Sequence, residues 1–167
     1  MKRNKTLRMA LAGILCAAAV VGSTLSFPIL SSKCSPVQHM VNVIAGVMLG
    51  PWYAVGMAFC ASLIRNLLGL GSLLAFPGSM CGALLCGIMH DKTKKIIPAV
   101  LGEIVGTGVI GGLLAYPLAV AFMGVDAGAV AFYAYVVPFL VSTAVGACVS
   151  GIVIAYLERG GLLRRVM

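Results

Sequence analysis

The chain has 167 residues, of which 61% are hydrophobic and only 10% are charged. Its mean hydropathy of +1.09 lies far above that of a soluble domain and predicts an integral membrane protein. The formal net charge of +8 does not indicate a nucleic-acid partner, because the basic residues stand in short blocks at the ends of apolar runs. In those places they set the orientation of a chain in the lipid bilayer.

The N-terminal residues 1–26 have the basic start and apolar run of a secretory signal. No small-residue cleavage site follows the run, and the bulky Leu15 precedes Cys16 where a lipoprotein signal needs a small residue. We therefore predict that this segment is retained as the first transmembrane helix.

The apolar runs predict an all-α fold, with one domain over residues 1–167. The predicted helices cover residues 8–26, 38–49, 51–69, 78–90, 96–122 and 132–158. Residues 27–37 contain two prolines and three serines, so we expect a loop there. The second and fourth helices are shorter than the roughly 20 residues that span a bilayer, so we expect them to be tilted, partly interfacial or extended by neighbouring segments.

The basic residues favour one orientation of these six helices. Lys33 is alone in the loops predicted outside, whereas the segments predicted inside carry Lys2, Arg3, Lys5, Arg8, Lys92, Lys94, Lys95, Arg159, Arg164 and Arg165. Because lysine and arginine concentrate on the cytoplasmic side, both termini are predicted to be cytoplasmic.

The sequence contains few motifs typical of disulfide formation, metal binding or catalysis. The six cysteines form no CxxC pair, which predicts neither a disulfide framework nor a metal site. The sequence has no HExxH, GxSxG or P-loop motif, so we expect binding without catalysis or a bound cofactor. Any energy source then belongs to another chain. The GlyXXXGly pairs at Gly102 and Gly106 and at Gly108 and Gly112 predict close helix packing.

Polar side chains gather at the predicted outer ends of the helices. Arg65 stands out, because an arginine at membrane depth costs a few kcal/mol and usually faces a polar interior. Depths estimated at about 1.5 Å per residue place the following at one outer pocket: Gln38, His39, Asn42, Arg65, Asn66, Tyr116 and Tyr133. The tyrosines also fit an aromatic belt at the membrane interface.

Glu103 is the only acidic residue inside a predicted helix core. At about 1.5 Å per residue it lies about 9 Å deeper than Arg65, so pairing requires an extended arginine or a bridging water. A direct contact with the ligand is the alternative, and both remain open.

Three blocks carry a family resemblance: KCSPVQHMVNVIAGVMLGPWYAV at 33–55, SLIRNLLGLGSLLAFPGSMCGALLCGI at 62–88 and GEIVGTGVIGGLLAYP at 102–117. The sequence resembles ThiW, the thiazole-specific S component of energy-coupling factor (ECF) transporters, from about residue 7 to 158. The resemblance implies capture of a thiamin precursor outside a prokaryotic cytoplasmic membrane, with 4-methyl-5-(2-hydroxyethyl)thiazole as ligand. It also implies a transmembrane T component and two cytoplasmic ATPases that use ATP.

The resemblance further implies where the ligand and the T component bind. It places the ligand against the loop after the first helix and the outer parts of later helices, which here carry Cys34, Gln38, His39, Ser79, Glu103, Tyr116 and Tyr133. Asn42, Asn66 and Phe76 are further candidates, and Arg65 is predicted to brace the pocket. The family's Ala-xxx-Ala contact with the T component has no strict copy, and the nearest pairs include Ala12 with Cys16 and Gly13 with Ala17.

Other functions remain open alternatives. The ligand can be the pyrimidine precursor or thiamin itself. A small membrane enzyme that uses Arg65, His39 and Glu103 on a lipid head group, or a scaffold subunit without a ligand, is a different class of function.

Overall fold

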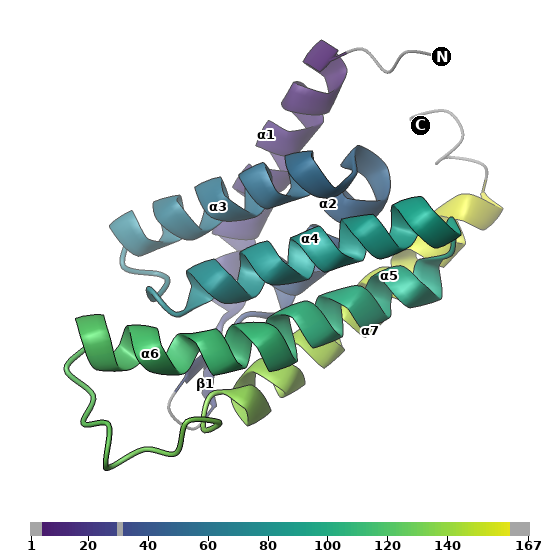
Figure 1. Ribbon diagram of the computed structural model, residues 1–167. Helices are drawn as coiled ribbons and strands as arrows, with labels where there is room; N and C mark the ends of the chain where they lie inside the picture. Colours follow the sequence, from purple (N-terminus) through teal and green to yellow (C-terminus); the bar gives the residue numbers. More distant parts are fainter. Residues whose placement is uncertain (1–4, 30–31, 161–167) are drawn as a thin grey trace.

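The structure is a computed structural model that describes residues 5–29 and 32–160, with side chains described for residues 5–26 and 35–160. Its helices are α1 (Lys5–Gly22), the short 3-10 helix η1 (Ser23–Leu25), α2 (Pro36–Leu49), α3 (Pro51–Leu67), α4 (Ala75–Thr93), α5 (Ile96–Glu103), the π-helical η2 (Ile104–Gly111), α6 (Gly112–Phe122) and α7 (Val136–Arg159). Helices α5, η2 and α6 follow one another without a break and form a single rod, as predicted for residues 96–122 (Figure 1).

Several element boundaries differ from the prediction. The predicted loop over 27–37 contains a short antiparallel hairpin of β1 (Phe27–Ile29) and β2 (Ser32–Cys34). Helix α2 then begins at Pro36, because a proline is tolerated in the first turn, where its missing N–H has no helical partner. For the same reason α4 begins before Pro77 and reaches 19 residues, longer than predicted. Helix α7 begins at Val136 instead of residue 132.

The helices form a bundle in which α4 packs against α2, α3, α5 and η2, and α7 packs against α2, α5 and η2. The first turn of α1, the α2–α3 and α4–α5 connections and the last turn of α7 lie toward one end of the bundle (Figure 1). The α3–α4 and α6–α7 connections lie toward the other end. Successive connections therefore alternate between the two ends.

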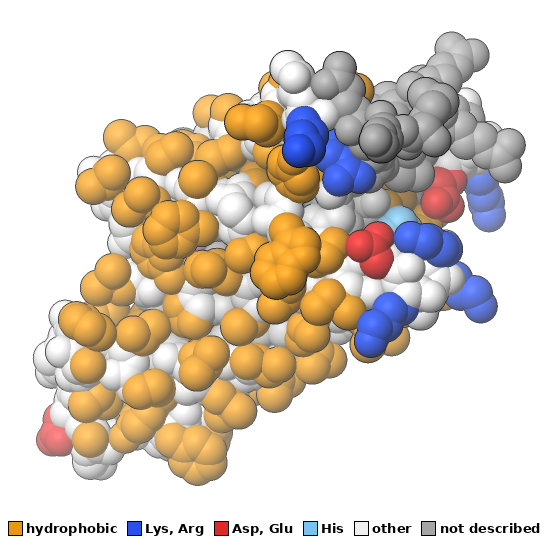
Figure 2. Space-filling model, turned by 45° about the horizontal axis from the view of Figure 1, so that its top comes forward, with side chains coloured by type: hydrophobic (Ala, Val, Ile, Leu, Met, Phe, Trp, Pro, Cys, Tyr) orange, Lys and Arg blue, Asp and Glu red, His pale blue; other side chains and the backbone are white. Residues whose placement is uncertain are grey.

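The surface is apolar along the helices. Within the part of the chain that the structure describes, three helical segments are long and apolar enough to cross a membrane: Lys5–Leu25, Ile96–Phe122 and Val136–Arg159. Large side chains such as Val21 and Ile152 are exposed on these segments. Figure 2 shows the lysines and arginines of the visible face gathered at one end, beside a broad apolar surface. Such a surface is typical of a membrane protein.

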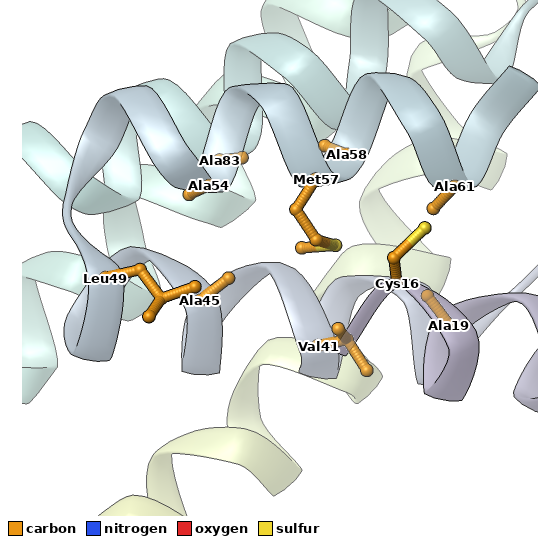
Figure 3. Packing of buried hydrophobic residues seen from close by; sticks show 10 residues of the cluster. All are labelled: Cys16, Ala19, Val41, Ala45, Leu49, Ala54, Met57, Ala58, Ala61 and Ala83. Atoms are coloured by element: carbon orange, nitrogen blue, oxygen red, sulfur yellow. The ribbon is translucent and has the colours of Figure 1, made fainter. Parts of the chain in front are cut away.

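Small side chains let α1, α2 and α3 approach one another closely. Cys16 and Ala19 of α1 face Val41 of α2 and Met57 and Ala61 of α3, and all five are buried (Figure 3). This cluster holds α1 against α2 and α3. The buried polar groups lie at the other contacts that α2 and α4 make.

Glycines permit the contacts between the α5–η2–α6 rod and its neighbours. A Cβ on Gly106 would lie 2.7 Å from the Cys81 carbonyl oxygen of α4, and one on Gly102 would lie 2.8 Å from the Leu85 carbonyl oxygen. On the other side, a Cβ on Gly112 would lie 2.7 Å from the Val136 Cα of α7. The close helix packing predicted from the GlyXXXGly spacing is confirmed.

We expect Gly106→Ala to lower the thermal unfolding temperature of the detergent-solubilised protein by several degrees, since the added methyl group meets backbone atoms that cannot rotate away. Gly56→Ala in α3 is the matched control, because a Cβ there has no described atom within 4 Å. That change should be neutral or stabilising by up to about 1 kcal/mol through helix propensity. Equal melting temperatures of the two variants would contradict the packing argument.

Candidate functional site

A buried carboxylate lies at the centre of the polar core. Glu103, at the end of α5, is fully buried, and its Oε1 atom accepts hydrogen bonds from Asn42 Nδ2 and Thr107 Oγ1, each at 3.1 Å. His39 Nδ1 lies 3.1 Å from the same oxygen. A buried charge is tolerated only where charged or hydrogen-bonding partners replace water. The carboxylate therefore joins α2 to the α5–η2 rod.

A second set of hydrogen bonds joins α2 to α3 and α4. Gln38 Nε2 donates to Ser62 Oγ at 3.2 Å, and the Ser62 and Ser79 hydroxyls are 2.9 Å apart. Asn42 Nδ2 also donates to the Ser79 carbonyl oxygen at 3.2 Å, which connects this set to Glu103. Helices α2, α3 and α4 and the α5–η2 rod thus share one buried polar network.

The network borders a cavity toward the end of the bundle that carries the α3–α4 connection. Its lining residues are Ser35, Gln38, His39, Arg65, Ser72, Ala75, Gly78, Ser79, Thr107, Phe139 and Ser142. The cavity measures about 30 Å³, which accommodates about one or two water molecules. Pockets for small organic ligands measure roughly 300–1,000 Å³, so the lining must move apart before such a ligand fits.

Arg65 lines this cavity from the last turn of α3 and is only 2% exposed. Its Nε and Nη1 atoms have no hydrogen-bond partner among the described residues. The pairing of Arg65 with Glu103, one of the two expectations, is not present: within the described residues Glu103 contacts His39, Asn42 and Thr107. The guanidinium therefore faces the cavity without a counter-charge.

Asn66 has the bracing contacts that were expected of Arg65. Its Nδ2 atom donates to the Ser62 carbonyl oxygen at 3.1 Å and to the Ser72 carbonyl oxygen at 3.0 Å. The first bond is within α3 and the second holds the α3–α4 connection, so the Asn66 amide fixes the segment that carries Ser72 to the cavity.

Other predicted site residues lie behind or away from the lining. Glu103 and Asn42 stand behind His39 and Thr107, as the contacts above require. Phe76 packs edge-on against Phe59 of α3, with ring centroids 5.7 Å apart.

The two predicted tyrosines are also outside the lining. Tyr116 Oη donates to the Ala127 carbonyl oxygen at 2.9 Å, and Tyr133 is 57% exposed beside Phe132. Cys34 ends β2, and its side chain lies outside the described residues.

Some lining residues escaped the sequence analysis. Thr107 stands four residues after Glu103, so both side chains lie on one helical face. This spacing could have indicated Thr107 from the sequence. Phe139 and Ser142 stand three apart near the start of α7, and the Ser142 hydroxyl accepts the Ser35 N–H at 3.0 Å. That contact joins residues 107 positions apart, so no local pattern indicated it.

The small residues considered for the T component lie on two faces of α1. Gly13 and Ala17 are exposed, whereas Cys16 is buried against α3. Ala12 and Gly13 also border an apolar groove of about 450 Å³ between α1 and α3. The exposed pair is the one that a partner helix can reach.

The chemistry available at the cavity is hydrogen bonding, one cation and one aromatic face. Among residues 5–29 and 32–160, no group of three or more His, Cys, Asp or Glu side chains is placed to hold a metal ion. These groups are suited to holding a small polar molecule in a fixed orientation.

Comparison with known proteins gives a match over most of the chain. The family model described as thiamine-precursor transporter protein (ThiW) matches residues 9–160. No curated protein matches the sequence.

We expect Glu103→Ala to lower stability by about 1–3 kcal/mol, because it removes the acceptor that His39, Asn42 and Thr107 share and leaves His39 Nδ1 buried without a partner. Asn42 Nδ2 and Thr107 Oγ1 keep the Ser79 and Gly78 carbonyl oxygens as acceptors. Glu103→Gln keeps a carbonyl oxygen at the Oε1 position and should cost about half as much or less. Thermal unfolding in detergent measures both. If the two variants unfold at the same temperature, the shared acceptor does not stabilise the core.

Proposed function

The chain belongs to the ThiW family of thiamine-precursor transporters, and we propose that it is the substrate-capture S component of an ECF importer for the thiazole precursor of thiamin. The simplest such ligand is 4-methyl-5-(2-hydroxyethyl)thiazole. In this proposal the protein binds the ligand from outside and delivers it inward with a T component and two ATPases, which hydrolyse ATP on the cytoplasmic side.

The observation that carries the proposal is the small cavity at one end of an apolar bundle, lined by several polar side chains. Its neutral donors and acceptors, Gln38, His39 and Ser79 among them, suit a small heteroaromatic ring with one hydroxyl. Phe139 offers a ring face for stacking.

Ligand entry requires a movable wall, and the α3–α4 connection is the best candidate. It contributes Ser72 to the lining and is attached to α3 through the Asn66 amide and the Arg65 carbonyl oxygen, which accepts the Leu70 and Gly71 N–H groups. Displacement of this short segment widens the cavity without disturbing the Glu103 network.

The membrane arrangement that we propose has six spans, with both termini in the cytoplasm of a prokaryotic cell. The alternation of connections between the two ends of the bundle and the basic residues at one end support it. The exposed Gly13 and Ala17 of α1 allow close approach of a T-component helix.

We expect the purified protein to bind hydroxyethylthiazole with measurable heat in a calorimetric titration and with a higher unfolding temperature. Thiamin and the hydroxymethylpyrimidine precursor are titrated in parallel. Binding of either of these without binding of the thiazole would reassign the ligand while keeping the transporter function.

We expect Ala75→Phe to weaken ligand binding by at least tenfold, because Ala75 is half-buried at the cavity and a phenyl group fills the remaining space. Ala129→Phe in the α6–α7 connection is the matched control, since Ala129 is exposed. The same titration measures both. Undiminished binding by the Ala75 variant would show that the ligand occupies another site.

We expect green fluorescent protein fused after Arg159 to fluoresce in bacterial cells and alkaline phosphatase fused there to be inactive. Fusions after Gly128, in the α6–α7 connection, should give the opposite pair of results. An active phosphatase after Arg159 would contradict a cytoplasmic C-terminus.

A further inference from the structure

The buried guanidinium of Arg65 carries a charge that a neutral thiazole alcohol does not balance. Arg65 is 2% exposed, and its Nε and Nη1 donors have no partner among the described residues. Burying a charge without hydrogen bonds costs several kcal/mol, and an arginine remains charged in proteins. Such a residue requires an anion or acceptor at the cavity.

The acidic side chains of this chain are all engaged elsewhere or remote. The chain has only four Asp and Glu residues. Glu103 Oε1 is held by His39, Asn42 and Thr107, and Oε2, although without a partner among the described residues, makes no ion pair with Arg65. Asp91 pairs with Lys94 near the opposite end, and Asp126 accepts the Gly128 N–H in an exposed turn. The fourth, Glu158, is exposed in the last turn of α7. The counter-charge for Arg65 therefore has to come from outside the chain.

The helix ends around the cavity add positive potential. The cavity is lined by Gln38 in the first turn of α2, by Ala75 at the first residue of α4 and by Phe139 in the first turn of α7. Each helix N-terminus carries roughly half a positive charge. The C-terminal end of α3 beside Arg65 supplies about half a negative charge, which three N-termini outweigh.

A neutral hydrogen-bond donor lines the same cavity as the Arg65 guanidinium. The Ser35 hydroxyl is buried at the cavity with no partner among the described residues. An oxyanion is stabilised by a guanidinium and hydroxyl groups together, through charge-assisted hydrogen bonds.

We propose that Arg65 and Ser35 form a subsite for an anionic substituent, so that the preferred ligand is a thiazole carrying a phosphate ester or a carboxylate instead of the neutral alcohol. This inference rests on the proposed thiazole-binding function and refines its substrate class. Burial of Arg65 inside the bundle favours an anion carried in by the ligand over the head group of a surrounding lipid.

The test compares three ligands on the purified full chain in nanodiscs of neutral lipid: the hydroxyethylthiazole alcohol, its phosphate monoester and 4-methylthiazole-5-carboxylate. We expect at least one of the two anions to bind at least tenfold more tightly than the alcohol. Arg65→Gln should reduce that ratio to within about threefold of one, and Arg65→Lys should keep part of it. Arg159→Gln, at the exposed end of α7, is the matched control and should keep the full ratio.

The outcomes separate the two proposals. If the alcohol binds as tightly as both anions to the wild-type protein, the anion subsite is wrong and thiazole capture stands, and this comparison needs no variant to fold. If none of the three thiazoles binds, both proposals fail. A last experiment adds inorganic phosphate, or replaces the neutral lipid by phosphatidylglycerol. If either one binds in an Arg65-dependent way while the three thiazoles bind equally well, the proposed subsite is wrong.

Discussion

The rest of the fold depends on the hydrogen bonds that one buried carboxylate oxygen, Glu103 Oε1, accepts. Glu103 cannot remain charged inside an apolar bundle unless several donors surround one of its oxygens, and α2 and η2 provide them through His39, Asn42 and Thr107. Because Asn42 also bonds to the Ser79 carbonyl, the same charge sets the position of α4. The relative placement of the helices that line the cavity follows from this network.

Glycine makes the network possible. The Gly82 backbone of α4 lies so close to Glu103 that a Cβ there would be 2.6 Å from Oε2 and would also overlap the Thr107 hydroxyl. Gly102 and Gly106 of the rod face α4, so the backbone of the rod packs directly against the backbone of α4. In a membrane, where the hydrophobic effect does not drive helix association, such close packing and buried hydrogen bonds are the available sources of stability.

Glu103 and Arg65 are both buried in this core, but they have different roles. Glu103 Oε1 has three partners within the chain, while Oε2 is buried without one among the described residues, so Glu103 supports the lining residues from behind. Arg65 has none in the described part of the chain and faces the cavity. A transporter site that leaves one charge unpaired is ready to distinguish ligands by charge, while the neutral groups Gln38 and Ser79 set the orientation of the ring.

The sequence by itself determined the helical class, the glycine-dependent packing, the membrane character and the family, because composition, spacing and long sequence blocks are local properties. Depth along the helices also predicted that Gln38 and His39 lie together, and the resemblance added Ser79; all three line the cavity. Only the tertiary structure decided that Arg65 faces the cavity while Asn66 braces it. Adjacent residues on a helix point about 100° apart, and which one meets a cavity depends on the rotation of α3 against its neighbours. That rotation is fixed by contacts distant in sequence, such as the one between Gln38 and Ser62.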